Sequence, residues 1–186
     1  MQEYNYNVNS ACCAQGLARD LSHLLQGKPP VIVCIGSDAV IGDSLSPLIG
    51  SLLKEFYRLP AYIYGELAHP VTAKELPLIA QTVKKLHPSA PVIAIDACVG
   101  NMEEIGLIKL KQGGLFPGKG VGKRLSPVGD IALMGVVSPR GKDAFRMLEL
   151  TRLRLVYRMA QKMASAIYGA LAPLLCVRES NPSPCA

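Results

Sequence analysis

The sequence lacks the features by which membrane, secreted and metal-dependent proteins are usually recognised. No apolar run reaches the ~18 residues that a membrane-spanning helix requires. Met1 is followed by polar residues, without the cationic start and apolar core of a secretory signal. The six cysteines include no CxxC pair, so we expect no metal and no other cofactor. We therefore expect a cytoplasmic protein with no membrane among its partners.

A concentrated basic surface is also missing. The net charge is +6, but the cations are dispersed along the chain, without a basic tail or an interleaving of basic and aromatic residues. Ordinary solvation explains this distribution, and an acidic or otherwise anionic partner fits the same charge. We expect no specific nucleic-acid partner. The sequence leaves the oligomeric state open, a homo-oligomer included.

What the chain does contain is enough apolar sequence for one domain. Its 186 residues are 49% hydrophobic and 18% charged, which is typical of a globular protein with a substantial core. The polar residues 1–10 are expected to be disordered, and residues 176–186 to form a loose tail. Between them, residues 11–175 are predicted to fold as a single domain.

The order of the apolar segments indicates an α/β fold. Predicted helices cover residues 11–26, 45–58, 74–86 and 143–171, and predicted strands cover residues 31–35, 61–64, 92–96, 105–110 and 130–137. The segment after residue 96 is too short for the crossover that parallel neighbours require, so the fourth strand should run antiparallel to the others. The predicted fold is a three-layer α/β/α sandwich with a mixed, mainly parallel five-stranded sheet.

Two aspartates follow strongly apolar segments and are the main candidates for chemistry. Asp43 lies in a Gly-Asp-Ser step before the second predicted helix, and Asp96 closes the apolar run that begins at Val92. Functional groups gather at the carboxyl ends of parallel strands, so the two carboxyls can share one site. Paired carboxyls can divide acid and base work, which points to hydrolysis. Taken singly, Asp43 is better explained as a helix cap, and Asp96 is equally well explained as a loop cap.

Two further side chains are predicted to contribute to substrate binding at the same edge of the sheet. Asp38 is a third acid in the loop that carries Asp43, although its position is also typical of a turn former. His69 follows the second predicted strand and could reach the same edge. A single histidine before a proline is otherwise an ordinary loop residue.

A glycine-rich loop joins the fourth and fifth predicted strands. Its Gly118, Gly120 and Gly122 permit a tight backbone path past a substrate, and we predict that the loop borders the aspartate site. The loop lacks the spacing and the strand-to-helix context of a phosphate-binding P-loop. A moving flap over a peptide and a purely structural connection are both compatible with this sequence.

Several segments match one known family in the right order. They are Val33–Asp38, Gly42–Leu45, Ile93–Cys98, Pro127–Asp130 and Thr151–Leu153. On these segments the chain resembles the YyaC family of sporulation proteins, described both as spore proteases and as a domain of unknown function. More distantly, it is similar to the germination protease that degrades small acid-soluble spore proteins. It is also similar to the hydrogenase-maturation endopeptidases, which have a mixed five-stranded sheet.

The resemblance implies an aspartate-dependent peptidase. The two essential aspartates of the germination protease occupy the places matched by Asp43 and Asp96. The implied substrate is a protein or peptide, with acidic spore proteins among the candidates, in the mother cell or forespore of a sporulating bacterium. The histidine with which the hydrogenase-maturation enzymes sense nickel has no match in this chain.

The motif around Asp43 departs from that of the germination protease. Of that motif this chain keeps only Asp43, Leu45 and Pro47. The departure keeps a second hypothesis open, in which the chain is a catalytically inactive binding or regulatory sporulation protein with the same fold. An Asp43→Asn variant separates the two hypotheses, because only a peptidase requires that carboxylate.

Overall fold

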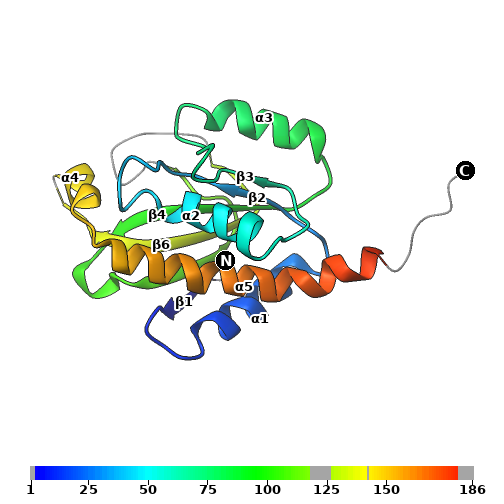
Figure 1. Ribbon diagram of the computed structural model, residues 1–186, viewed down its shortest axis with the longest axis horizontal. Helices are drawn as coiled ribbons and strands as arrows, with labels where there is room; N and C mark the ends of the chain where they lie inside the picture. Colours follow the sequence, from blue (N-terminus) through cyan, green and yellow to red (C-terminus); the bar gives the residue numbers. More distant parts are fainter. Residues whose placement is uncertain (1–2, 118–126, 142, 180–186) are drawn as a thin grey trace, which may run out of the picture.

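The fold is described from a computed structural model (Figure 1), which describes residues 3–117, 127–141 and 143–179. The predicted substrate-binding residues Gly118, Gly120 and Gly122 lie outside the described residues. The described part of the chain contains no helix that is both long and apolar enough to cross a membrane.

A six-stranded sheet forms the centre of the molecule. Its strands are β1 (Glu3–Asn7), β2 (Val31–Cys34), β3 (Ile63–Tyr64), β4 (Val92–Gly100), β5 (Leu107–Gln112) and β6 (Ile131–Pro139). Their order across the sheet is β1-β5-β6-β4-β2-β3. Strands β3, β2, β4 and β6 run parallel, and β5 is antiparallel to both of its neighbours. The mixed, mainly parallel sheet is confirmed, with six strands instead of five.

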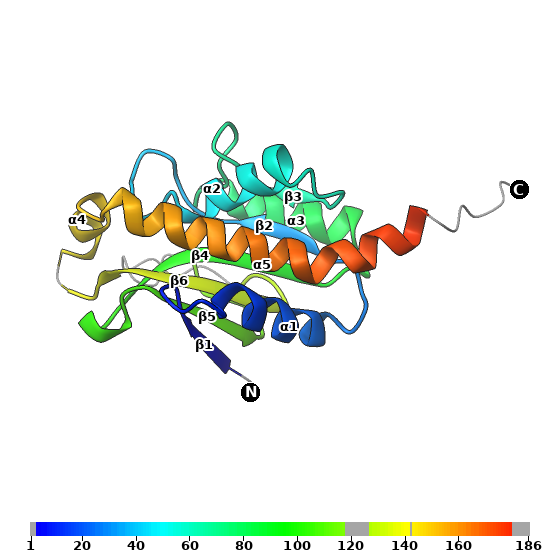
Figure 2. The same ribbon diagram turned by 60° about the horizontal axis from the view of Figure 1, so that its bottom comes forward.

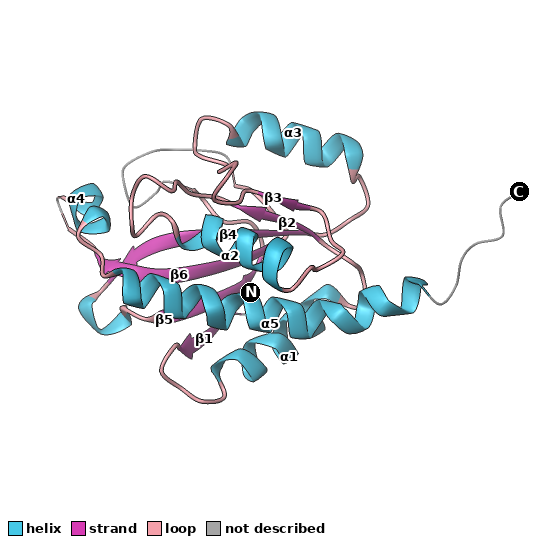
Figure 3. Ribbon diagram, in the orientation of Figure 1, coloured by secondary structure: helices cyan, strands magenta, loops and turns pink. Residues whose placement is uncertain are grey.

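Helices cover both faces of this sheet, and Figure 3 separates them from the strands by colour. They are α1 (Cys13–Leu25), α2 (Leu45–Ser51), α3 (Leu76–Leu86), α4 (Ala144–Glu149) and α5 (Leu153–Glu179). A π-helical turn, η1 (Leu52–Phe56), continues α2, and a 3-10 turn, η2 (Met102–Glu104), precedes β5. The predicted helix at 74–86 is present as α3, with Pro77 in its first turn, where a missing N–H leaves no bond unmade.

The core has two parts, one on each face of the sheet. The larger part joins α1, α2 and α5 to side chains such as Ile93, Ile95 and Leu133. The smaller part joins α3 to the side chains that alternate with these, such as Val33, Ala94 and Ala132. Helices α2 and α5 pack against each other, and in Figure 1 α3 lies on the far side of β2 and β3 from α5, whereas in Figure 2 α3 lies behind α2. This arrangement is the predicted three-layer α/β/α sandwich.

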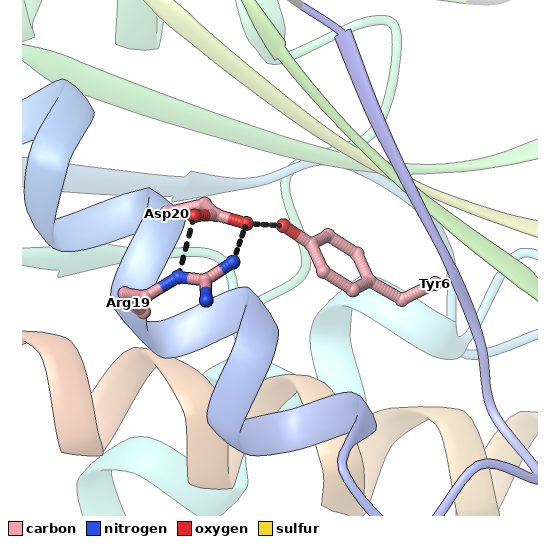
Figure 4. A network of polar contacts seen from close by, with 3 residues as sticks. All are labelled: Tyr6, Arg19 and Asp20. Carbon is pink, nitrogen blue, oxygen red and sulfur yellow. Dashed lines mark hydrogen bonds and ion pairs between the residues drawn. The ribbon is translucent and has the colours of Figure 1, made fainter.

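The expectation of a disordered segment at residues 1–10 is wrong, because β1 forms an edge of the sheet. Glu3 to Asn7 pair in antiparallel register with Lys111 to Leu107 of β5. The Tyr6 hydroxyl donates to the Asp20 carboxylate of α1 at 2.5 Å, and the Arg19 Nε donates to the same carboxylate at 2.9 Å (Figure 4). The hydrogen bond from Arg19 lowers the pKa of Asp20. Backbone pairing and this carboxylate together hold a polar segment in place.

The predicted helix at 143–171 is interrupted. Helix α4 ends at Glu149, and α5 begins at Leu153. The carbonyl of Leu148 accepts a hydrogen bond at 2.9 Å from the N–H of Gly42, which lies in the loop after β2. A distant segment therefore takes part in ending α4. The expected tail at 176–186 begins within α5, and residues 180–186 lie outside the described residues.

Strand β4 is longer than predicted. It pairs with β6 from Ile93 to Gly100, whereas its pairing with β2 stops at Ile95 opposite Cys34. Asp96 therefore does not close the strand, as the sequence suggested. It lies within β4, at the first position beyond the ladder with β2.

Candidate functional site

The loop after β2 carries Asp43 along a path that is fixed by close backbone contacts. A Cβ atom on Gly36 would lie 2.2 Å from the carbonyl oxygen of Asp43, so only glycine fits there. The Ser44 hydroxyl donates to the carbonyl of Ile41 at 2.8 Å, and the Ser44 N–H donates to the carbonyl of Val40 at 2.9 Å. These contacts close the turn that presents Asp43 immediately before α2.

The two ends of the Asp43 turn are held by different elements. On one side, a Cβ atom on Gly42 would lie 2.8 Å from the Leu148 side chain of α4. On the other side, a Cβ atom on Gly135 of β6 would lie 2.3 Å from Leu45 Cδ2. Gly135 pairs with Ala97, the residue after Asp96. The absence of a side chain at Gly135 thus lets the start of α2 approach the part of β4 that carries Asp96.

Asp96 lies on the face of the sheet opposite α1, α2 and α5. Successive side chains of a strand point to opposite faces, and Ile93, Ile95 and Ala97 belong to the layer with those helices. Asp96 and Cys98 therefore project to the other face, together with Met134 of β6, which packs against the smaller core. Asp96 itself is half-buried.

Both aspartates line one cavity of about 510 Å³. Its other polar or reactive side chains are Cys98, Lys111 and Arg140. Its apolar and backbone lining comes from Ala97, Val99, Gly114, Leu115, Phe116, Ala132, Met134 and Leu148. The volume falls within the ~300–1,000 Å³ that is usual for ligand-binding clefts. The structure therefore brings the two predicted catalytic residues to the same cavity.

The electrostatics of the cavity favour the protonated form of Asp96. Burial raises the pKa of Asp96 well above its ordinary value, and the charge of Asp43 raises it further. The N–H of Ala97 opposes this shift by hydrogen bonding, but it is the smallest of the three effects. Although Asp96 is reached from the cavity, dense protein surrounds its carboxyl group, so the direction of the shift follows from ordinary desolvation. A carboxyl whose pKa is raised in this way is suited to donating a proton.

Cys98 lies in the same cavity but is not activated for nucleophilic chemistry. Burial, followed by the nearby charge of Asp96, raises the pKa of the Cys98 thiol to about 12. A thiol needs a lowered pKa to supply a reactive thiolate at neutral pH. The carboxyls are therefore the groups in this cavity that are suited to proton transfer.

Two cations in the lining were missed by the sequence reading. Lys111 is the next-to-last residue of β5 and lies on the same face as Lys109, and Arg140 follows β6. Lys109 is paired with Glu104, whereas neither Lys111 nor Arg140 forms an ion pair with any carboxylate in the described part of the chain. The alternation Lys109-Leu110-Lys111 was the available signal, because it predicts two lysines on one face of a strand.

The predicted substrate-binding residues lie away from the cavity or outside the described residues. Asp38 is exposed in the loop before Asp43 and is not among the residues that line the cavity. His69 is largely exposed, and its Nδ1 lies 3.3 Å from a carboxylate oxygen of Glu66. The beginning of the glycine-rich loop, Gly114–Phe116, does line the cavity. Within the described residues, no group of three His, Cys, Asp or Glu side chains is arranged to hold a metal ion.

Comparisons with known proteins place the chain in a family. The family model described as "Protein of unknown function (DUF1256)" matches residues 3–166. "Uncharacterized protein YyaC" of Bacillus subtilis (strain 168) is 41% identical over 141 residues, which are 76% of this chain and 69% of that protein. A [NiFe] hydrogenase maturation protease, HycI from Thermococcus kodakarensis KOD1, is 17% identical, with a TM-score of 0.48 over 80% of this chain and 98% of that chain.

Proposed function

We propose that this chain, which belongs to the DUF1256 family of proteins of unknown function, is a peptidase in which Asp43 and Asp96 divide the proton transfers of peptide hydrolysis. The observation that carries the proposal is that both carboxyls line one cavity and that the charge of Asp43 raises the pKa of Asp96. In this proposal Asp43 is the base and Asp96 the acid. Catalytic groups whose proton affinities are pushed apart by their surroundings are typical of acid–base sites.

The proposed reaction uses one water molecule. The Asp43 carboxylate accepts a proton from water as its oxygen attacks the carbonyl carbon of the scissile peptide bond. The carbon–nitrogen bond then breaks as Asp96 donates its proton to the leaving amine. The products are a new carboxyl terminus and a new amino terminus. Transfer of the proton from Asp43 to Asp96, directly or through water, restores the starting state.

The proposed substrate is a polypeptide with acidic side chains. Lys111 and Arg140 supply positive charge to the cavity wall. Leu115 and Phe116 supply apolar surface beside them, and Phe116 is 57% exposed. Such a lining suits a peptide that combines carboxylates with apolar side chains. The resemblance to sporulation proteins supports acidic spore proteins as the biological substrates and the cytoplasm of a sporulating cell as the location.

The decisive experiment is a search for new peptide termini. Wild-type protein and the Asp96→Asn variant are incubated separately with extracts of spore coat and spore core, and the products are read by mass spectrometry. Asp38→Asn is the matched control, because it removes an exposed carboxylate from the Asp43 loop without touching the cavity. We expect new termini with wild type and Asp38→Asn, but not with Asp96→Asn.

The opposite outcome would favour a binding or regulatory protein. If wild type and Asp96→Asn give the same termini, the observed cleavage does not depend on the proposed acid. If wild type gives none, while extract proteins bind equally to wild type and to Asp43→Asn, the cavity binds polypeptide without hydrolysing it.

A further inference from the structure

Strand β4 has an open edge beside the two aspartates. Alternate residues of a strand direct their N–H and C=O groups to opposite neighbours. The carbonyls of Val92 and Gly100 accept hydrogen bonds from Asp130 (2.8 Å) and Arg140 (2.7 Å) at the two ends of β6. The carbonyls of Pro91 and Ile95 accept from Val31 (2.9 Å) and Ile35 (2.8 Å) along β2. By this alternation, Ala97 and Val99 direct their backbone groups toward the side of β2.

On that side β2 no longer accompanies β4. The ladder between the two strands ends where Cys34 meets Ile95. Beyond it, the N–H of Gly36 donates to the carbonyl of Val71 at 3.0 Å, which lies away from β4. Within residues 3–117, 127–141 and 143–179, no other backbone pairs with Ala97 or Val99 on this side, and the N–H of Ala97 interacts with the Asp96 carboxyl that a substrate would meet there.

The open edge faces the cavity. The side chains of Ala97 and Val99 pack with the helical layer on the far face of the sheet. Both residues nevertheless line the cavity, and both are only half-buried. The backbone of β4, rather than its side chains alone, therefore borders the space that Asp43 and Asp96 share.

We propose that an extended segment of the polypeptide substrate adds to β4 as a short strand, pairing with Ala97 and Val99 so that its scissile bond lies between Asp43 and Asp96. The inference rests on the proposed peptidase function and specifies how the substrate binds. A row of alternating backbone donors and acceptors is complementary to another extended chain. Backbone pairing would fix the register and depth of the bond to be cut, while side chains of the substrate contact Phe116, Lys111 and Arg140.

Strand addition predicts the substrate positions at which proline is not tolerated. Every second residue of the added segment directs its N–H toward β4, and proline has no N–H to donate. Peptides made by tryptic digestion of a bacterial lysate are incubated with the wild-type protein, and the cleaved sites are aligned. We expect proline to be at least ten times rarer at alternate positions around the cleaved bond and tolerated at the positions between them. Tolerance at every position, or depletion without alternation, would overturn the proposal.

A variant of the protein tests the proposed pairing by changing β4 instead of the substrate. Val99→Pro removes one N–H from the open edge and none from the ladder with β6, a substitution that strand edges tolerate. Val99→Ala is the matched control, since it also shortens the side chain but keeps the N–H. We expect Val99→Pro to lower peptide cleavage at least tenfold relative to Val99→Ala, with unchanged circular dichroism. Equal cleavage by the two variants would overturn the proposal, and an unfolded Val99→Pro leaves the proline alignment as the test.

Binding without cleavage separates this inference from the peptidase proposal. Each Val99 substitution is combined with Asp96→Asn, and retention of the same tryptic peptides is measured by ultrafiltration and mass spectrometry. Retention by the Val99→Ala protein but not by the Val99→Pro protein supports strand addition, even if wild type cuts nothing. Equal retention contradicts strand addition while leaving hydrolysis intact. Absence of both retention and cleavage contradicts both proposals.

Discussion

The two faces of the sheet differ in what their side chains do. On the face covered by α1, α2 and α5, β4 and β6 contribute large aliphatic residues such as Ile93, Ile95 and Leu133, all fully buried. On the opposite face the same strands contribute Ala132 and Asp96, which line a cavity. Because alternate residues of a strand face opposite sides, adjacent residues of β4 and β6 contribute to the larger core on one face and to the cavity on the other. Substitutions on the two faces should therefore affect different properties, and each prediction below tests that separation.

The largest effect is expected for the carboxyls of the cavity face. Asp43→Asn and Asp96→Asn should each lower the rate of peptide hydrolysis by about 10²–10⁴-fold, the usual contribution of a positioned acid or base. The fold should be retained, because neither side chain supports the larger core. Cleavage kinetics and circular dichroism check this, with Asp38→Asn as the control. A variant that unfolds instead of losing only activity would contradict the expectation that substitutions on the cavity face leave the fold intact.

The activity should also depend on pH in a defined direction. Because burial and Asp43 raise the pKa of Asp96, hydrolysis should fall as the pH rises through that raised pKa and the acid loses its proton. A pH–rate profile of wild type measures this alkaline limb. A rate that keeps rising into the alkaline range would contradict the assignment of Asp96 as the acid.

The next largest effect is expected on the helical face. Leu17 of α1 is fully buried in the larger core, so Leu17→Ala should lower the free energy of unfolding by about 2–5 kcal/mol. Activity per folded molecule should be unchanged. Urea denaturation measures the loss, and Leu78→Ala on α3 is the control, because Leu78 is 66% exposed and should change stability by less than about 0.5 kcal/mol.

A contact within the helical layer, beside the turn that carries Asp43, should give a smaller, coupled effect. Gly135→Ala places a methyl group against Leu45, and overpacking of this kind costs about 1–3 kcal/mol. It should also lower activity, because Leu45 directly follows the turn that carries Asp43. Combining it with Leu45→Ala should recover part of both losses, with an interaction energy of about 0.5–3 kcal/mol. Strict additivity of the two substitutions would show that they do not share this contact.

The cations of the cavity should affect substrate binding more than the chemical step. Removing both charges with Lys111→Gln and Arg140→Gln should raise KM for acidic peptides about tenfold, equivalent to about 1.4 kcal/mol, with a smaller change in kcat. Lys109→Gln is the matched control, because Glu104 already pairs with that lysine. Steady-state kinetics at low and moderate salt measure the difference. Equal effects of the three substitutions would contradict a specific role for the two unpaired cations.

The smallest effect is a gain in stability from removing the Asp96 carboxyl. The pKa of Asp96 is raised in the folded protein relative to the ordinary 3.8, so the folded chain holds the proton more tightly than the unfolded chain. Stability from this group is therefore present at acidic pH and is lost as the pH rises above about 4. Asp96→Asn should raise the Tm by about 2–4 °C at pH 7, the shift that about 1 kcal/mol produces in a domain of this size. The gain should disappear near pH 4, and a constant gain would contradict the explanation.

Much of the fold could be predicted because its central segments are locally consistent. The apolar runs around Val33 and Ile95 indicate buried strands, and α1 and α3 show regular apolar spacing. The reversal of β5 followed from the length of its connection. Strand β1 was missed because its glutamate and asparagines resemble a polar terminus, although Tyr4 and Tyr6 alternate with them as in a half-buried strand. Its order comes from pairing with β5 and from packing of the two tyrosines against the larger core. The interruption between α4 and α5 was missed because it involves Gly42, far away in the sequence.

The site was partly predictable for a related reason. Asp43 and Asp96 could be named because each follows an apolar run, and parallel strands bring such positions together. The true place of Asp96 within β4 depends on the pairing of β4 with β2 ending five residues before its pairing with β6, and no local sequence pattern indicates this difference. Arg140 gave no signal in the sequence, since its approach to the cavity depends on the length of β6. His69 and Asp38 had suitable chemistry, but their loops lead them away from the cavity.

The polar strand β1 has a consequence for how the molecule is made. It leaves the ribosome well before its partner, which is residues 107–111 of β5. At about 5–20 residues per second, synthesis of the intervening chain takes on the order of ten seconds. During that time β1 waits without its partner, and its Glu-Tyr-Asn-Tyr-Asn sequence is too polar to be an aggregation-prone strand. The polar residues that made β1 hard to predict therefore also lower the risk that the nascent chain aggregates before β5 is synthesised.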